Sequence, residues 1–318
     1  DMSGDGFGSG MVISKHTRLV CASDHRHLLL DPNPDAAISF KERQRLFDLP
    51  RSSWADYDAK LISKGGGIHD RSAKSIELTP QVREALGIDA SVKSMTPNEL
   101  MHAALRAPVD LLWNGGIGTY VKATSETNAE VGDRANNGLR VNGADLRCKV
   151  VGEGGNLGMT QLGRIEAAQA GVLLNTDFID NSAGVDTSDH EVNIKILVGS
   201  AITNGVLPME ERAPLLASMT DEVGHKVLAH NYDQTLALSL QQAEGVGALD
   251  AQERFMQTLS ARGKLDRKVE GLPSSLRVKE MLAAGLPLAR PELAVLMAYG
   301  KLELSDDMGS VMDLRLAI

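Results

Sequence analysis

The chain has 318 residues, enough for two ordinary domains that each bury a core. Its formal net charge is -9 and its Lys and Arg are dispersed, so no basic stripe is present that would neutralise a nucleic acid backbone. No run approaches the ~20 apolar residues of a membrane span, and the start lacks a basic-then-apolar signal segment, so we expect a soluble, cytoplasmic protein with no nucleic acid or membrane partner.

Cysteine and histidine usage gives no metal-binding pattern. Cys21 and Cys148 are the only cysteines, and each lies beside valines in a predicted strand, which favours buried free thiols over a disulfide or a metal site. Among the eight histidines, His25 and His27 form the only close pair, which we interpret as part of an ordinary loop. The sequence therefore predicts no metal.

The first hundred residues begin with alternating glycines and then become irregular. Residues 11–16 are predicted to finish a short helix, and the β-rich run of residues 17–22 ends at Ser23 and Asp24. The segment from residue 38 to residue 76 is polar and predicted to be irregular. Thr96, followed by Pro97 and by Glu99 at the third position, predicts a capping box that opens a helix reaching residue 107.

Three short apolar strands follow, and each runs into a loop rich in Gly or Asn. Residues 109–113 lead into "NGGIGTY", residues 148–153 into "GGNLG", and residues 171–178 into "DNSAGVD". Strands of this kind, separated by helical stretches, predict an α/β fold with a Rossmann-like, doubly wound parallel sheet. Because ligands bind outside the carboxyl ends of such strands, these loops mark the expected site.

The chain changes character near Ser188. Ser188 and Glu191 have capping-box spacing before an apolar-periodic run, which predicts that a long helix begins there. From this point to Ile318 the sequence is predicted to be mostly helical. We therefore expect a dinucleotide-binding domain over residues 1–195 and a helical domain over residues 196–318.

The opening glycines fit part of a dinucleotide-binding motif. Such a motif needs a strand, a tight glycine turn at a helix start, and an acidic residue about 20 positions on for the ribose; the step from Gly4 to Asp24 has that length. The first strand is missing, so we expect the chain to be a fragment that starts within the motif. Plain tight turns, with Asp24 making only a local turn bond, are the alternative. An acidic Asp24 favours NAD over NADP, although Arg26 nearby could tolerate a phosphate.

Several long blocks make the chain similar to the large bacterial NAD-dependent glutamate dehydrogenases. These blocks are "DMSGDGFGSGM", "DHRHLLLDPNPD", "GGGIHDRSAKSI", "DLLWNGGIGTYVKA", "VVGEGGNLGMTQ", "NTDFIDNSAGVDTSDHEVNIKIL" and "RPELAVLMAYGKLEL". The resemblance implies an oxidoreductase of amino-acid catabolism that uses NAD. It also implies that Asp1, Met2, Ser3 and Gly4 belong to the phosphate-binding loop.

The wider amino-acid dehydrogenase superfamily suggests further cofactor contacts. Its glutamate–glycine–alanine–asparagine segment is similar to "EGGN", residues 153–156. The resemblance implies that Glu153 and Asn156 line the nicotinamide side, with Asn156 bonding the ribose or carboxamide, and that Asn114, Gly115 and Gly116 are neighbours. Turn or helix-cap roles are the alternatives for these residues.

The segment "NSAGVDTS" resembles the superfamily's substrate segment, in which a serine contacts the side-chain carboxylate of glutamate. Ser188 occupies the matching position, and helix capping by the same hydroxyl is the alternative. The implied reaction is oxidative deamination of glutamate to 2-oxoglutarate and ammonium. The resemblance places the catalytic lysines and aspartate in an upstream substrate domain, so the catalytic residues of this chain are unknown; we also expect a homo-oligomer. A dehydrogenase of another L-amino acid and a non-catalytic NAD-binding regulatory module are the competing functions.

Overall fold

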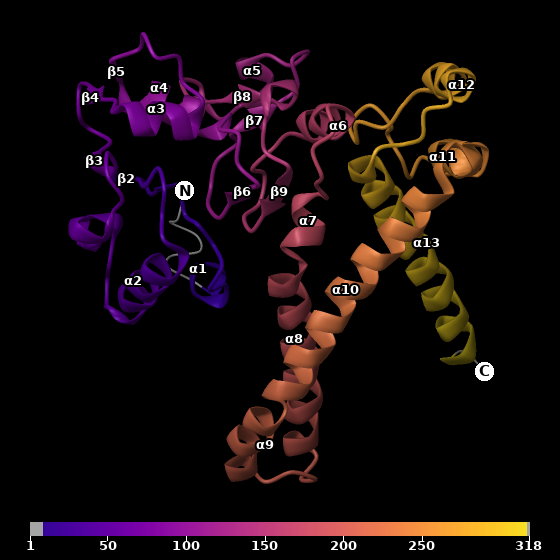
Figure 1. Ribbon diagram of the computed structural model, residues 1–318. Coiled ribbons are helices and arrows are strands. Elements are labelled where there is room, and N and C mark those ends of the chain that lie inside the picture. Colours follow the sequence, from indigo (N-terminus) through magenta and orange to yellow (C-terminus); the bar gives the residue numbers. More distant parts are fainter. Residues whose placement is uncertain (1–8, 317–318) are drawn as a thin grey trace. The chain divides into compact units, whose positions relative to one another are not determined.

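The computed structural model describes residues 9–316, which belong to two compact units divided between Asp177 and Phe178 (Figure 1). The boundary expected near residue 195 falls inside α8 (Ser182–Thr203). None of the helices described is long and apolar enough to cross a membrane.

The first unit opens with helix α1 (Ser9–Ile13) and a small antiparallel sheet in the order β1-β2-β3. Its strands are β1 (Cys21–Ser23), β2 (His27–Leu30) and β3 (Gly67–Asp70). The expected strand of residues 17–22 is therefore shorter, and the chain reverses direction at Asp24 to form a hairpin. This reversal is not what a continuous parallel sheet requires.

Helix α2 (Ala36–Asp48) lies in the segment that was predicted to be irregular, so that prediction was wrong. The helix buries a charged side chain, Arg43, which makes four hydrogen bonds, the longest of them to the Thr17 carbonyl. Its Nε donates to the Met11 carbonyl (2.7 Å), its Nη1 to Ser39 Oγ (2.6 Å) and its Nη2 to the Ser14 carbonyl (3.1 Å). Hydrogen bonding permits a buried charge that hydropathy patterns place at the surface.

The middle of the first unit combines a short antiparallel pair with two capped helices. β4 (Ile76–Glu77) pairs with β5 (Ser94–Met95), and α3 (Pro80–Leu86) lies between them in sequence. Helix α4 (Pro97–Leu105) starts with the predicted capping box: Glu99 N donates to Thr96 Oγ1 at 3.3 Å, and Thr96 N donates to the Glu99 carboxylate at 2.8 Å. The predicted helix start is confirmed.

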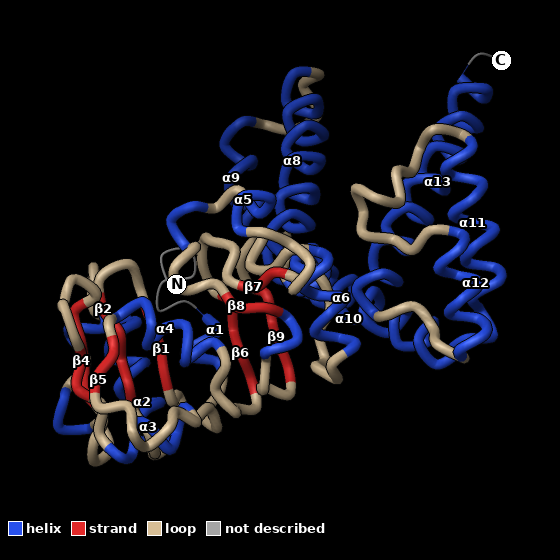
Figure 2. The backbone as a smooth tube through the Cα atoms, turned by 90° about the horizontal axis from the view of Figure 1, so that it is seen from above, coloured by secondary structure: helices blue, strands red, loops and turns tan. Residues whose placement is uncertain are grey.

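Parallel pairing occurs in the last part of the first unit. β6 (Leu111–Asn114) and β9 (Val150–Glu153) run side by side in Figure 2, and Val150 also forms a parallel bridge to Leu173. β7 (Val121–Lys122) pairs in parallel with β8 (Val141–Asn142). Helices α5 (Asn128–Val131) and α6 (Gln161–Gln169) complete this region. The fold is mixed α/β as expected, but the described strands form four small sheets instead of one continuous sheet.

The second unit is built from helices over its described residues. After α7 (Asp177–Asp180), which spans the division, they are α8, α9 (Arg212–Ser218), α10 (Thr220–Glu244), α11 (Leu249–Ala261), α12 (Ser275–Ala284) and α13 (Arg290–Leu316). Buried aliphatic and methionine side chains form its core, among them Leu238, Leu249, Met256, Val278, Met281 and Leu293. The predominantly helical character predicted for this part of the chain is thus present.

The predicted start of the long helix at Ser188 was wrong, because α8 begins at Ser182. Asn231 of α10 fixes the earlier turn: its Nδ2 donates to Ser182 Oγ and to the Ile179 carbonyl, both at 2.9 Å. This tertiary contact between segments far apart in sequence is invisible to a local capping pattern. Ser188 therefore lies inside the helix and does not cap it.

Candidate functional site

Two of the predicted loops come together where β6 and β9 end. The two strands are in register, with Asn114 opposite Glu153, so the loops that follow leave the same edge. Gly155 N donates to the Asn114 carbonyl at 3.0 Å. A β-carbon on Gly155 would lie 2.7 Å from the Gly116 carbonyl oxygen, which leaves no room for the superfamily's alanine at this position. The expected gathering is therefore observed for these two loops. The prediction for the third was wrong, because "DNSAGVD" belongs to the helices α7 and α8 and does not follow a named strand.

The exposed aromatic side chain of Trp113 covers Gly152 of β9 and Gly154 just after the strand. A β-carbon on Gly154 would lie 2.4 Å from the Trp113 ring, and one on Gly152 would lie 2.7 Å from the same ring. The Trp113 side chain is nevertheless 43% exposed. Glycine at these two positions therefore lets an indole lie flat beside the strand ends, where it offers an apolar surface to a ligand.

A buried ionic network anchors the loop after β9. Arg164 of α6 binds Glu153 with two hydrogen bonds of 2.7 and 2.9 Å, and its Nη2 lies 3.1 Å from Asp177 Oδ1. Burial lowers the pKa of Arg164, but the hydrogen bonds and charges of Glu153 and Asp177 outweigh burial and raise it. Both Glu153 oxygens thus bind Arg164. Glu153, which the sequence predicted to line the cofactor, therefore anchors the loop that follows β9. Nothing in the sequence pattern had distinguished Arg164.

The same network holds a residue in an unfavourable backbone conformation. Leu157 has a φ of 60°, in the left-handed region that side chains other than glycine rarely adopt. Its N–H donates to Asp177 Oδ2 at 2.8 Å, and its carbonyl accepts a bond from Thr119 Oγ1 at 2.7 Å. Its neighbour Asn156 is exposed. The loop that presents Asn156 is therefore fixed on both sides.

Asn114 is a buried amide with unused hydrogen-bonding capacity. The residue is only 9% exposed, and neither Nδ2 nor Oδ1 has a hydrogen-bond partner among the described residues. Its amide lies against Gly158, where a β-carbon would come within 1.3 Å of Nδ2. A buried polar group without a partner costs about 1–3 kcal/mol, which a ligand with a donor and an acceptor would recover. The carboxamide of nicotinamide is such a group.

Asp24 makes the local turn bonds that are the alternative to ribose binding. Its Oδ1 accepts from the backbone N–H groups of Arg26 (2.7 Å) and His27 (2.6 Å). Its carbonyl accepts from Arg71 Nη1 at 2.9 Å. Arg71 lies close enough to Tyr120 to lower that residue's pKa, against the larger effect of burial, which raises it. Arg71 thus holds the turn of the β1–β2 hairpin through the Asp24 carbonyl.

The remaining predicted residues are not gathered at this point. Asp1, Met2, Ser3 and Gly4 lie outside the described residues. Ser188 is exposed on α8 in the second unit. Its place inside the helix removes the argument that a helix N-terminus attracts the substrate's carboxylate, and leaves the family resemblance as its support.

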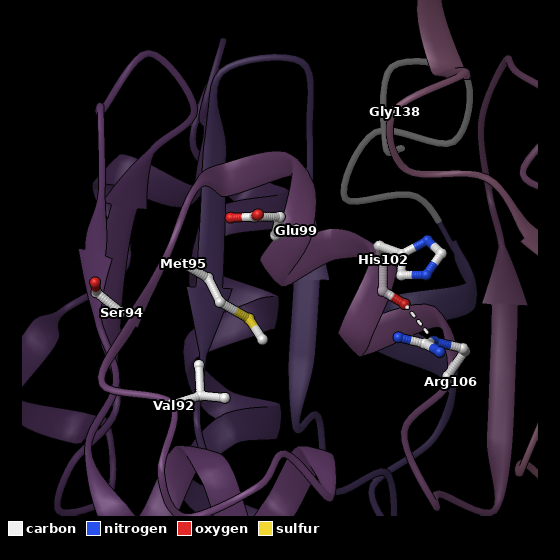
Figure 3. A pocket seen from close by; sticks show the side chains of 7 residues that line it. All are labelled: Val92, Ser94, Met95, Glu99, His102, Arg106 and Gly138. Atoms are coloured by element: carbon white, nitrogen blue, oxygen red, sulfur yellow. Dashed lines mark hydrogen bonds between the residues drawn. The ribbon is translucent and has the colours of Figure 1, made fainter.

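A separate hollow lies beside α4 in the first unit (Figure 3). Its ionisable side chains already have partners: Glu99 belongs to the capping box, His102 Nδ1 lies 3.1 Å from the Leu139 carbonyl, and Arg106 Nε donates to the His102 carbonyl at 3.4 Å. These contacts are structural. The orphaned amide and the glycine loops at the ends of β6 and β9 therefore make the stronger candidate.

A mixed α/β unit in which glycine loops close parallel strands is typical of nucleotide-binding enzymes. Residues 1–241 match the family described as bacterial NAD-glutamate dehydrogenase, catalytic domain, and the chain therefore belongs to this family.

Three relatives, each called NAD-specific glutamate dehydrogenase, align with nearly the whole chain. The chain is 58% identical to the protein of Pseudomonas aeruginosa over 308 residues, 54% identical to that of Mycobacterium tuberculosis over 312 residues, and 54% identical to that of Halomonas elongata over 308 residues. Each alignment covers 97% of this chain but 19% of the relative. The chain thus spans about a fifth of the length of these proteins.

The ion pairs of Arg164 with Glu153 and Asp177 are expected to stabilise the fold. Replacing Arg164→Met leaves Glu153 and Asp177 buried without their counter-charge, so the free energy of unfolding should fall by about 3–5 kcal/mol. Chemical denaturation measures the change. Lys149→Met is the matched control, because Lys149 pairs with Asp110 at 2.7 Å on the exposed surface and should change stability little. Equal losses in the two variants would contradict a structural role for the network.

Proposed function

We propose that this chain is the NAD-binding part of a glutamate dehydrogenase, and that its first unit holds the dinucleotide at the carboxyl ends of β6 and β9. The observation that carries the proposal is the buried Asn114 amide, which has no hydrogen-bond partner among the described residues. It lies where the loops after β6 and β9 pack against each other. The parallel bridges from β9 to β6 and to Leu173 support a Rossmann-like arrangement for this region.

The residues at the site suit a nicotinamide dinucleotide. The Asn114 amide offers both a donor and an acceptor to the nicotinamide carboxamide. Gly115 and Gly116 have no side chain, so their backbone can approach the ligand closely. The side chain of Asn156 is exposed, and we assign it to the ribose. When bound, NAD would supply the acceptor for the hydride that leaves the amino-acid Cα.

Asp24 is proposed to select NAD over NADP. One carboxylate oxygen, Oδ1, is used by the hairpin turn, and we assign the other to the ribose hydroxyls of the adenosine half. The negative charge would also repel a 2′-phosphate. In this proposal the turn bonds orient Asp24, so that the local and functional roles coexist.

The reaction proposed for the whole polypeptide is oxidative deamination of L-glutamate to 2-oxoglutarate and ammonium. We assign the Ser188 hydroxyl to the side-chain carboxylate of the substrate, on the strength of the family resemblance. The base that deprotonates the amine and activates water is proposed to belong to another part of the longer polypeptide, together with the cationic groups that hold the α-carboxylate. A homo-oligomeric, cytoplasmic enzyme is proposed on the same resemblance.

Cofactor binding is tested by NADH titration of this chain. Asn114→Ala should weaken NADH binding by about tenfold, because the ligand loses a hydrogen bond worth about 1.4 kcal/mol. Asn98→Ala, which removes an exposed amide on α4, is the matched control and should bind as the unaltered chain does. Asp24→Asn keeps the turn acceptor but loses the charge, so it should reduce the preference for NADH over NADPH. The proposal would be refuted by a folded chain that does not bind NADH, or by equal NADH binding in Asn114→Ala and Asn98→Ala.

Substrate choice is tested by Ser188→Ala in the full-length enzyme. Loss of a hydrogen bond to a charged carboxylate should raise KM for glutamate by about tenfold or more and leave KM for NAD unchanged. The control is Thr187→Val, because the Thr187 hydroxyl donates to the Ala183 carbonyl at 2.7 Å within the helix. An unchanged KM for glutamate would refute the assignment of Ser188, whereas a higher kcat/KM for another L-amino acid than for glutamate would favour the competing dehydrogenase.

A further inference from the structure

Three side chains able to bind a metal ion meet on the second unit. Asp186 and His190 are one turn apart on α8, and His230 comes from α10. One ligand atom from each lies within 4.8 Å of the others. The proposed dinucleotide residues belong to the first unit, so this cluster is made from a separate set of residues.

The distances within the cluster are close to those of a coordination site. His190 Nε2 lies 3.6 Å from Asp186 Oδ1, and His230 Nδ1 lies 2.8 Å from Asp186 Oδ2. The two imidazole rings are stacked, with centroids 5.7 Å apart. Tetrahedral zinc with bonds of about 2.0–2.1 Å separates its ligand atoms by about 3.3 Å, which is close to both distances from the Asp186 carboxylate.

His190 adds an independent observation. Its Nε2 is buried and has no hydrogen-bond partner, and this is the nitrogen that faces Asp186. A buried ring nitrogen without a partner is unfavourable unless something binds it. His230, in contrast, is 51% exposed, which leaves a route for an ion and for a water ligand.

The helices that carry the ligands are fixed close to the cluster. Asn231, next to His230, donates to Ser182 Oγ and to the Ile179 carbonyl at 2.9 Å, which holds α10 against the first turn of α8. A site supported in this way keeps its ligands near their coordinating positions before the ion arrives.

We propose that Asp186, His190 and His230 bind a divalent transition-metal ion of the zinc class, which clamps α8 to α10. Two imidazoles and one carboxylate are ligands that zinc accepts, whereas Mg²⁺ prefers oxygen ligands alone. The cluster has no sequence signature, because His230 is far from the other two ligands along the chain. The hydrogen bond between Asp186 and His230 would also join the helices without an ion, and this is the competing interpretation.

Calorimetric titration of the chain with Zn²⁺ tests the proposal, with Mg²⁺ as a parallel titrant. We expect one Zn²⁺ per chain and no binding of Mg²⁺ at the same concentration. His190→Ala and His230→Ala should each weaken Zn²⁺ binding by about tenfold or more. The matched control is His225→Ala, since His225 is exposed on α10 and its ring bonds the Asp221 carbonyl.

A second measurement separates loss of a ligand from loss of the fold. Asp186→Asn keeps an oxygen acceptor for His230 but removes the anionic ligand, so it should fold and bind Zn²⁺ more weakly. Zn²⁺ should raise the unfolding temperature of the unaltered chain and of His225→Ala, and raise it much less in Asp186→Asn. Absence of saturable Zn²⁺ binding, or equal binding by Asp186→Asn and the unaltered chain, would overturn the proposal.

Discussion

The buried guanidinium of Arg164 between two carboxylates is the interaction on which the candidate site depends. It fixes Glu153 at the end of β9 and Asp177 after the neighbouring parallel segment, and Asp177 in turn holds the strained Leu157. Removing the cation would leave two charges without compensation in a poorly solvated place. The network thus sets the path of the loop that carries Asn156.

Close packing of backbone is the second constraint. Glycines at positions 152, 154, 155 and 158 each occupy a place where a β-carbon would collide with the Trp113 ring, the Gly116 carbonyl or the Asn114 amide. The small residues let two loops and an indole share one strand edge. Because successive side chains of a strand point to opposite faces, the Trp113 ring lies on the exposed face of β6 and the unsatisfied Asn114 amide on its buried face.

The sequence could predict the features that depend on local chemistry. The capping box at Thr96, the parallel strands before "NGGIGTY" and "GGNLG", the free cysteines and the helical second unit all follow from short patterns and are present. The features it missed depend on distant partners. Arg43 of α2 donates to the Met11 carbonyl before β1, Asn231 of α10 donates to Ser182 at the start of α8, and His230 joins a cluster on another helix. Asp24 shows a further limit, because one pattern fits both a turn and a ribose contact.

Hydrogen exchange of the chain with and without saturating NADH tests the central claim most directly, because it locates the ligand. If the dinucleotide binds at the ends of β6 and β9, amides in residues 113–118 and 153–158 will exchange more slowly, while those of residues 92–106, beside the hollow at α4, will not change. Protection confined to residues 92–106, or no protection at either loop under saturation, would contradict the account.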